Sequence, residues 1–390
     1  MNEPIELLFD LIRIPGESGC EQKISDTIRQ LVLDAGVPAS GIRTDEAHKK
    51  SMYGGQTGNL YVDIPGAGQD DRIMLSTHMD TIPIALGSQP EVWNNRIVDA
   101  RDTGSLGGDA RAGCAVLIHA MRKVMELNGN HPPVSFVFFV QEEVGLVGSG
   151  HMSAAQAGTP RPAMCFNVDG GDPAQIEHRI TGAERMNISV RGVCSHSGRP
   201  HLGISAAAIQ ARAFSRLVDD GWHGVVDRQG KTGTANLGIL QGGKGSNQVM
   251  PELYCLAEAR SFDREFRKEI IRKWNQVFAE AADFFNQQLD VEDSASVEFS
   301  PGPVYEAVNL SEEDAVVAVA QQALRTCGLE PELHTDMGGQ DVNNINAAGI
   351  PAVGVGCGCH NAHAPDEYVD INEFNTSCRM AEILVTRQLK

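Results

Sequence analysis

Short apolar runs that end on a histidine or a carboxylate are the feature of this sequence that most constrains its fold. Residues 134–140 and 163–168 are almost wholly apolar, and Ile73-Met74-Leu75 is the core of a third run. Such runs are typical of strands buried on both faces, as in a sheet flanked by helices. Ligands of open α/β sheets bind outside the carboxyl ends of the strands. The polar residues that follow these runs are therefore candidate functional residues.

The candidates are imidazoles and carboxylates, which are ligands for zinc and similar ions. They are His78 in Ser76-Thr77-His78-Met79-Asp80-Thr81, Asp109 in Gly107-Gly108-Asp109, the pair Glu142-Glu143, Asp169 in Asn167-Val168-Asp169-Gly170, and His363 in the segment 359–367. Two metal ions a few ångströms apart need one bridging carboxylate and about two further ligands each. Two imidazoles and three carboxylates supply that number. One acid of the Glu142-Glu143 pair then remains as a general base on a metal-bound water.

Each of these residues has a simpler explanation when it is taken alone. A Glu-Glu pair is usually surface charge, and Asp109 stands where it would cap a helix. Asp80 is either a turn residue or the group that accepts the second imidazole N–H of His78 and fixes its ring. A thiolate zinc site at Cys357-Gly358-Cys359-His360 lacks a second cysteine pair at the usual spacing, so reduced thiols in a glycine-rich loop are the better interpretation. The joint appearance of the candidates at strand ends favours a metal site.

Composition and charge exclude several classes of protein. The 390 residues carry a formal net charge of −19, which argues against binding to a nucleic-acid backbone. No apolar run approaches the roughly 18 residues that span a bilayer, and the first six residues lack the basic and apolar regions of a secretory signal. The nine cysteines follow no framework spacing, so we expect reduced thiols in a cytoplasmic protein.

The pattern of the chain changes near Gly182 and changes back near Ser300-Pro301-Gly302-Pro303. Between these points Met186, Ile188 and Val190 alternate with polar residues, as in a strand with one solvated face. A helix-like segment follows at 263–287. We predict an α/β fold with an inserted α+β domain that contains an antiparallel sheet. The expected catalytic domain is a mixed, mostly parallel sheet flanked by helices; it comprises residues 1–182 and 301–390, and the insertion comprises residues 183–300.

At these residues the chain resembles the di-zinc exopeptidase family that includes peptidase T, aminoacylase, succinyl-diaminopimelate desuccinylase and carboxypeptidase G. The likeness covers nearly the whole chain, and its ordered motifs are His78-x-Asp80, Gly-x-Asp109, Glu142-Glu143, Asp169, His196-Ser-Gly, the Asn247 loop, Arg260 and His363. Peptidase T-like members are the most similar, through residues 142–148, Gly338-Gly339-Gln340-Asp341 and Asn361 to Glu367.

The resemblance implies a role for each candidate ligand. Asp109 would bridge two metal ions, normally Zn²⁺, with Co²⁺ or Mn²⁺ as substitutes. His78 and Asp169 would complete one site, and Glu143 with His363 would complete the other.

It also implies roles around the metals. Glu142 would be the general base and later the general acid, and Asp80 would orient His78. The Asp109–Ala110 peptide bond would be cis. The family usually has Asp or Asn and then Lys after the bridging Asp; this chain has Ala110-Arg111, a departure that leaves the bridging role intact and the local support of the loop open.

In this family the inserted domain is a lid and often a dimer surface, so we expect a homodimer through that domain. On their own, His196, Asn247 and Arg260 carry no assigned task, and Arg260 is either a bidentate partner for a carboxylate or a solvated strand residue. The resemblance has His196 reach the neighbouring subunit's active site and help to hold the oxyanion. Asn247 and Arg260 would contact the substrate, at its carboxylate end.

The expected reaction is hydrolysis of a peptide bond in short peptides. In the family, Asp at the position of Asp169 accompanies aminopeptidases and dipeptidases, whereas Glu accompanies several deacylases and carboxypeptidases. A tripeptidase-like aminopeptidase is therefore the leading hypothesis, and an N-acyl amino acid deacylase is the alternative. A metal-dependent binding protein without turnover is the third, and the intact Glu142 and ligand set oppose it.

Overall fold

The computed structural model describes residues 3–67, 70–101, 103–288 and 293–388, and the chain divides into two compact units. One unit contains Met1–Ile180 and Val308–Lys390, and the other contains Thr181–Ala307. The insertion therefore extends beyond the expected limit at residue 300. The reason is that the Pro301-Gly302 segment lies at a register shift within strand β13 (Ser296–Tyr305), which goes on to pair with β9 (Gly182–Arg191) as far as Tyr305.

The larger unit is built on a mixed sheet, as the sequence predicted. Four central strands are parallel neighbours, in the order β6, β3, β7 and β16, and the pairs β1–β2, β2–β6, β16–β8 and β8–β14 are antiparallel. Strand β15 pairs with β8 in parallel. The strands are β1 (Ile42–Thr44), β2 (Leu60–Ile64), β3 (Ile73–His78), β6 (Val134–Phe139), β7 (Met164–Asp169), β8 (Gln175–Ile180), β14 (Val308–Asn309), β15 (Glu332–Asp336) and β16 (Ala352–Gly356).

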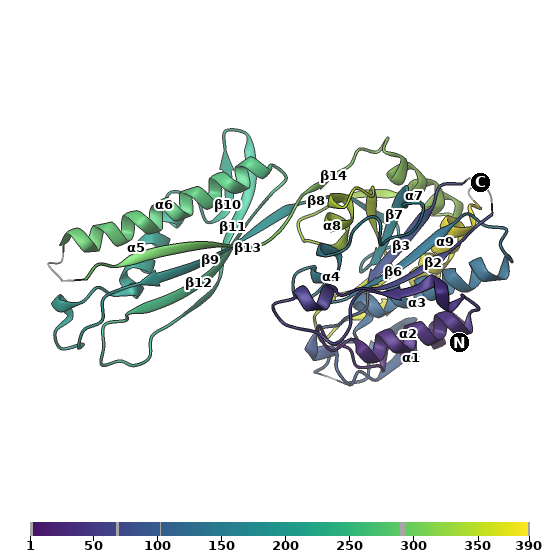
Figure 1. Cartoon of the computed structure of the whole chain (residues 1–390), viewed down its shortest axis with the longest axis horizontal. Helices are drawn as coiled ribbons and strands as arrows, with labels where there is room; N and C mark the ends of the chain where they lie inside the picture. The colour runs from purple at the N-terminus through teal and green to yellow at the C-terminus, as the bar shows by residue number, and fades with distance from the viewer. Residues whose placement is uncertain (1–2, 68–69, 102, 289–292, 389–390) are drawn as a thin grey trace. The chain divides into compact units, whose positions relative to one another are not determined.

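Both faces of this sheet are buried, which accounts for its continuous apolar runs. Leu75 and Phe136 point into the larger core, whereas their neighbours Met74 and Val137 point into a second core on the opposite face. The helices of the larger core are α1 (Glu3–Ile12), α2 (Gln22–Asp34), α3 (Gly108–Glu126), α7 (Ala315–Thr326) and α9 (Ile371–Thr386). Helix α8 (Asp341–Ala347) covers the opposite face, and the short α4 (Val147–Gly150) lies against α8 (Figure 1).

A small antiparallel sheet, which the sequence did not predict, joins distant parts of this unit. Its order is β17 (Cys359–His360), β18 (Tyr368–Asp370), β5 (Arg96–Asp99) and β4 (Pro90–Trp93). Asp370 ends β18 and caps α9, because its carboxylate accepts hydrogen bonds from the backbone N–H groups of Asn372 and Glu373. The segment that contains His363 is therefore fixed at both ends. The 3-10 helices are η1 (Ala39–Gly41), η2 (Ala47–Lys50), η3 (Pro83–Ala85) and η4 (Pro200–Leu202).

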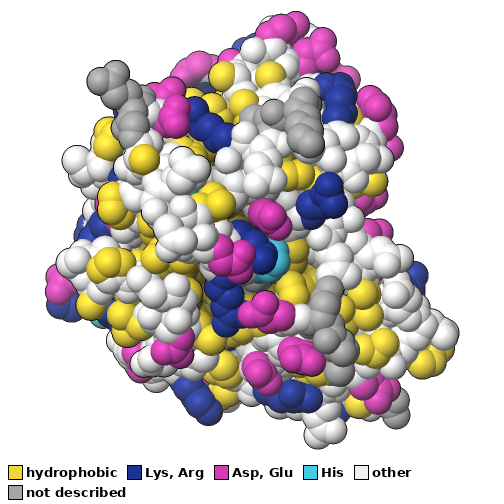
Figure 2. All heavy atoms as spheres, turned by 90° about the vertical axis from the view of Figure 1, so that its right-hand side faces the viewer, with side chains coloured by type: hydrophobic (Ala, Val, Ile, Leu, Met, Phe, Trp, Pro, Cys, Tyr) yellow, Lys and Arg dark blue, Asp and Glu magenta, His cyan; other side chains and the backbone are white. Residues whose placement is uncertain are grey.

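The inserted unit has a five-stranded antiparallel sheet with two helices. The strand order is β10 (Gly224–Arg228), β11 (Lys231–Gly242), β12 (Glu252–Ser261), β9 and β13. Helices α5 (Ala206–Asp219) and α6 (Arg264–Gln288) pack on it, and Ile188 and Trp274 belong to their shared core. None of the helices in the described part of the chain combines the length and the hydropathy of a membrane-spanning segment. On the face shown in Figure 2, acidic, basic and apolar side chains are interspersed, so no single sign of charge dominates it.

Candidate metal centre and active site

The central strands bring the predicted ligands to one edge of the sheet. β3 ends on His78 and its parallel neighbour β7 ends on Asp169. On the other side of β3, Phe139 of β6 is in register with His78, so Glu142 and Glu143 follow immediately beyond the same edge. The order of the strands therefore brings polar residues that are far apart in the sequence together in one cluster.

Asp109 lies between the two histidines and offers one carboxylate oxygen to each. Its Oδ1 is 3.0 Å from His78 Nε2, and its Oδ2 is 3.4 Å from His363 Nε2. Asp169 Oδ1 is 3.7 Å from His78 Nε2, and Glu143 Oε1 is 2.8 Å from His363 Nε2. Two groups of three ligand atoms result, each with all its members within 4.8 Å of one another, and Asp109 belongs to both.

Glu142 lies beside these two groups of ligand atoms but belongs to neither of them. It forms a third cluster with His78 and Glu143, again within 4.8 Å. Burial raises the pKa of Glu142 well above the usual range for a carboxyl, and the neighbouring carboxylates raise it further, although His78 opposes them. A carboxylate of raised basicity beside the ligands is suited to proton transfer.

The charges of the cluster fit cations. Burial lowers the pKa of His78, but hydrogen bonds to Asp109 and Asp169 outweigh burial and raise this pKa well above its normal value. Hydrogen bonds to Asp109 and Glu143 likewise raise the pKa of His363 to about 10. The carboxylates thus stabilise positive charge at both imidazoles, and a metal ion competes with a proton for the same nitrogen lone pair. The donor set, imidazole nitrogen with carboxylate oxygen, suits zinc and similar ions.

The site opens to solvent on one side. His78 is only 1% exposed, whereas half of the His363 side chain is exposed. A substrate therefore has access at the His363 end of the cluster.

Asp80 connects the first histidine to the Glu142-Glu143 turn. Its Oδ1 lies 3.4 Å from His78 Nδ1, and the backbone carbonyl of Asp80 is slightly closer, at 3.2 Å. The same carboxylate accepts the backbone N–H of Glu142 at 3.0 Å and that of Glu143 at 3.2 Å. Asp80 therefore fixes the imidazole and the two glutamates together.

Sequence reasoning missed the segment after α1, in which Ser18 contacts Asp80 and Glu21 contacts Gln141. The Ser18 hydroxyl donates to Asp80 at 2.6 Å, and buried Glu21 accepts the backbone N–H of Gln141 at 3.1 Å. Burial, followed by the charge of Asp80, raises the pKa of Glu21 to about 7. A buried polar pair in a loop has no periodic signature, so only the structure reveals it.

The loop after Asp109 is supported by an arginine. The Arg111 side chain is buried and donates to the backbone carbonyls of Ile14 at 3.2 Å and Gly16 at 3.5 Å. Arginine here thus ties the first turn of α3 to the segment after α1. The Asp109–Ala110 peptide bond is cis, as the resemblance predicted.

The thiolate alternative is not supported. Cys357 and Cys359 are free and buried, and burial raises the pKa of both thiols well above the usual range. Neither belongs to a candidate metal group among the described residues.

Three predicted site residues, His196, Asn247 and Arg260, belong to the inserted unit. Two of them lie in neighbouring loops, and the third lies on a strand. The backbone of His196 forms an antiparallel bridge with Gln248, and the Asn247 carbonyl accepts the backbone N–H of Ser197, so the His196 and Asn247 loops are neighbours. Arg260 on β12 donates to both carboxylate oxygens of Glu258, at 2.9 and 3.3 Å. Its bidentate carboxylate partner is thus a residue of the same strand.

Comparison with known proteins places this site in a class. Residues 74–387 match Peptidase family M20/M25/M40, and the chain belongs to this family of metallopeptidases. Over 387 residues it is 30% identical to the uncharacterized protein YqjE of Bacillus subtilis, with 99% of this chain and 98% of that protein covered.

Solved structures also resemble the whole chain, and two of them are 26% identical to it. The aminopeptidase PepT from Bacillus cereus is 26% identical, with a TM-score of 0.83 and coverage of 99% of this chain and 98% of that one. A tripeptidase from Staphylococcus aureus is also 26% identical, with a TM-score of 0.85 and coverage of 98% and 97%. These likenesses extend over both units and confirm the predicted peptidase T-like membership.

Proposed function

We propose that this protein is a metal-dependent aminopeptidase that hydrolyses short peptides, with tripeptides as its leading substrates. The observation that carries the proposal is the placement of Asp109, whose two oxygens each face one histidine of a separate ligand group. Full-length similarity to an aminopeptidase and to a tripeptidase supports the choice of substrate. The choice of substrate is also supported by Asp169, because Asp at this position in the family accompanies aminopeptidases and dipeptidases.

Two Zn²⁺ ions per chain are the proposed cofactor, because mixed imidazole and carboxylate ligands favour zinc, with Co²⁺ or Mn²⁺ as substitutes. One ion would be held by His78, Asp109 and Asp169. The other would be held by Asp109, Glu143 and His363. Metal ions at these positions supply Lewis acidity, which polarises the scissile carbonyl and makes a nearby water more acidic.

The protein's own groups would move the proton. Glu142 takes a proton from the attacking water and then delivers it to the leaving amine. Asp80 holds the backbone of Glu142 through a 3.0 Å hydrogen bond, so the base stays at a fixed distance from His78. The partly buried position of Glu142 strengthens it as a base.

The inserted unit would complete the site in a homodimer. We assign His196 of one subunit to the developing oxyanion in the other, and Asn247 and Arg260 to the carboxylate end of the peptide. The adjacency of the His196 and Asn247 loops supports a shared task. We also propose a cytoplasmic location, which the nine free cysteines support.

A substrate panel tests this function. Zinc-loaded protein is assayed for amine release with unblocked tripeptides, dipeptides, N-terminally acetylated tripeptides and N-acetyl amino acids. The proposal expects turnover of unblocked tripeptides and loss of turnover on acetylation. Preference for N-acetyl amino acids would instead establish a deacylase, and inactivity of fully metal-loaded protein on every substrate would establish a binding protein.

A further inference from the structure

Glu367 is a buried carboxylate that faces the loop of the bridging aspartate. It is 2% exposed, and its Oε2 accepts the backbone N–H of Gly107 at 2.8 Å and a hydrogen bond from the Ser105 hydroxyl. Its Oε1 accepts the backbone N–H of Asp109 itself at 3.0 Å and lies 3.3 Å from the Cys359 thiol. Both oxygens are therefore engaged, and the two backbone donors come from the loop that ends on Asp109.

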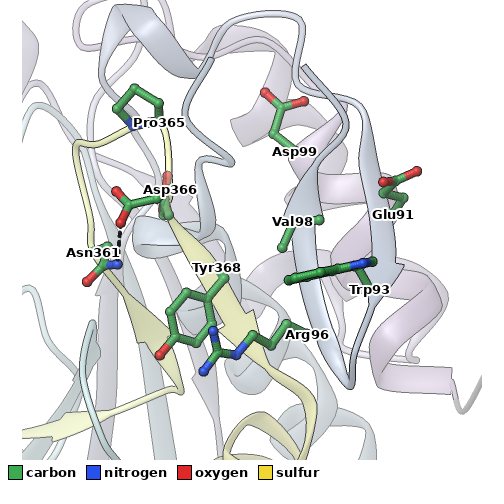
Figure 3. Close-up of a pocket in the computed structure, with 10 residues that line it drawn as sticks. Glu91, Trp93, Arg96, Val98, Asp99, Asn361, Pro365, Asp366 and Tyr368 are labelled. Atoms are coloured by element: carbon green, nitrogen blue, oxygen red, sulfur yellow. Dashed lines mark hydrogen bonds between the residues drawn. The ribbon is translucent and has the colours of Figure 1, made fainter. Parts of the chain in front are cut away.

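The backbone around Glu367 is itself fixed. Figure 3 shows the hollow that Glu367 helps to line, between the β4–β5 hairpin and the loop that runs from Asn361 to Asp366. The Asn361 amide donates to Asp366 at 2.8 Å, and the Arg96 guanidinium lies 3.8 Å from the centre of the Tyr368 ring. The neighbours of Glu367 on either side are thus held by contacts that do not involve the metal ligands.

The loop before Asp109 needs such an anchor. Gly107 adopts a left-handed backbone (φ 77°), and Gly108 follows it, so this segment has little conformational restriction of its own. This segment also packs directly on strand β18, which follows Glu367, since a Cβ at Gly108 would lie 2.8 Å from Val369 Cγ2. The hydrogen bonds that Glu367 accepts from Ser105, Gly107 and Asp109 select one conformation of this segment.

We propose that Glu367 is a positioning residue, which sets the Asp109 carboxylate so that one oxygen faces each metal. The inference rests on the two-metal site of the proposed function. Glu367 and His363 belong to one short segment, so the anchor also holds the bridging carboxylate in register with the second histidine. Because both metals share Asp109, loss of the anchor should weaken both sites, whereas loss of a ligand such as Glu143 should weaken one.

Zinc affinity, rather than activity alone, tests this assignment. Metal-free full-length protein is titrated with Zn²⁺ against a chromophoric chelator, for the wild type, Glu367→Gln, Glu143→Gln and Glu373→Gln. The Glu367→Gln substitution keeps the shape of the side chain but leaves only one acceptor oxygen, and the new amide N–H₂ group must face a hydrogen-bond donor. We expect both zinc affinities to fall by about 10–100-fold, the usual range for groups that orient metal ligands. Excess zinc should restore part of the turnover.

Glu373→Gln is the matched control. Glu373 pairs with His360 at 2.5 Å on the same part of the chain, outside the hydrogen bonds of the Asp109 loop, so both zinc affinities should match the wild type. A merely structural Glu367 would lower the melting temperature of the metal-free protein and leave both zinc affinities unchanged, and that result would overturn the inference. So would a loss confined to one site.

A second variant covers the case in which Glu367→Gln does not fold. Ser105→Ala removes a single donor to the same carboxylate, and it should weaken both zinc sites by a smaller factor. Unchanged affinities in this variant would also contradict the assignment. Failure of the wild type to bind two zinc ions would instead overturn the proposed function, so the two failures are distinguishable.

Discussion

Replacement of Glu142 by glutamine separates catalysis from metal binding. Glutamine has the same shape, and the hydrogen bond that holds this position to Asp80 comes from the backbone N–H, so the turn should be unchanged. Neither of the two groups that share Asp109 needs Glu142 as a member, so both metals should remain. The side chain loses only its ability to accept and return a proton.

The size of the loss follows from that single role. Positioned general acid–base groups contribute about 10²–10⁴-fold to a rate, which corresponds to about 2.7–5.4 kcal/mol of activation free energy at 1.36 kcal/mol per tenfold. We expect kcat on a tripeptide to fall by this factor, with little change in KM. The acid limb of the pH–rate profile should also disappear from the residual activity, because the proposed mechanism requires Glu142 to be deprotonated.

Steady-state kinetics with elemental analysis decide the matter. The wild type, Glu142→Gln and a control variant, Glu126→Gln, are loaded with zinc. Glu126 suits the control because it is exposed at the end of α3 and pairs with Lys123. Wild-type turnover in Glu142→Gln would refute the assigned role. Loss of zinc from Glu142→Gln would show that this carboxylate is a ligand instead.

Three further predictions concern the ligands, the inserted unit and pH. Asp109→Asn should release both metals but Glu143→Gln only one, as elemental analysis would show; two metals retained in Asp109→Asn would contradict a bridging role. His196→Ala should slow tripeptide hydrolysis without loss of metal, and mixing it with Glu142→Gln subunits should restore part of the turnover; no recovery in proven heterodimers would exclude action across the dimer. The raised pKa of Glu21 means that its contribution to stability is full below about pH 4.5 and is lost as pH rises through about 7. Glu21→Gln should therefore reduce the fall in melting temperature of the metal-free protein over that interval, and an unchanged pH profile would contradict this.

The strand-end part of the site was predictable from sequence because its geometry is a property of the sheet. Once β3, β6 and β7 are parallel neighbours, polar residues at their carboxyl ends must meet, and the apolar runs mark where those ends lie. The ligands outside strands were not predictable in this way. Asp109 lies in the first turn of α3 and His363 lies between β17 and β18, and their assignment to the two metal sites rested on the resemblance to a family.

Other features carry no sequence signal, because their partners are distant or irregular. The limit of the insertion was expected at Pro301-Gly302, where proline and glycine usually end a strand, but here they mark a register shift within β13. The β4–β5 hairpin was missed because its strands are short and its outer side chains, such as Trp93, are exposed. Glu367 stood in a motif that was recognised, yet its partners lie about 260 residues earlier in the chain, and no periodicity connects them.

In the proposed two-metal site, these distant contacts would hold the shared ligand Asp109 in place. A carboxylate that bridges two cations must present its two oxygens in different directions at once, so a small rotation weakens both metals. Asp109 stands at the start of a helix, after two glycines, where the backbone alone does not prevent such rotation. Arg111 restrains the chain after Asp109, and Glu367 restrains it before Asp109 and at the residue itself. The two restraints come from opposite ends of the sequence, so the proposed bridging geometry would require that both parts of the larger unit be folded together.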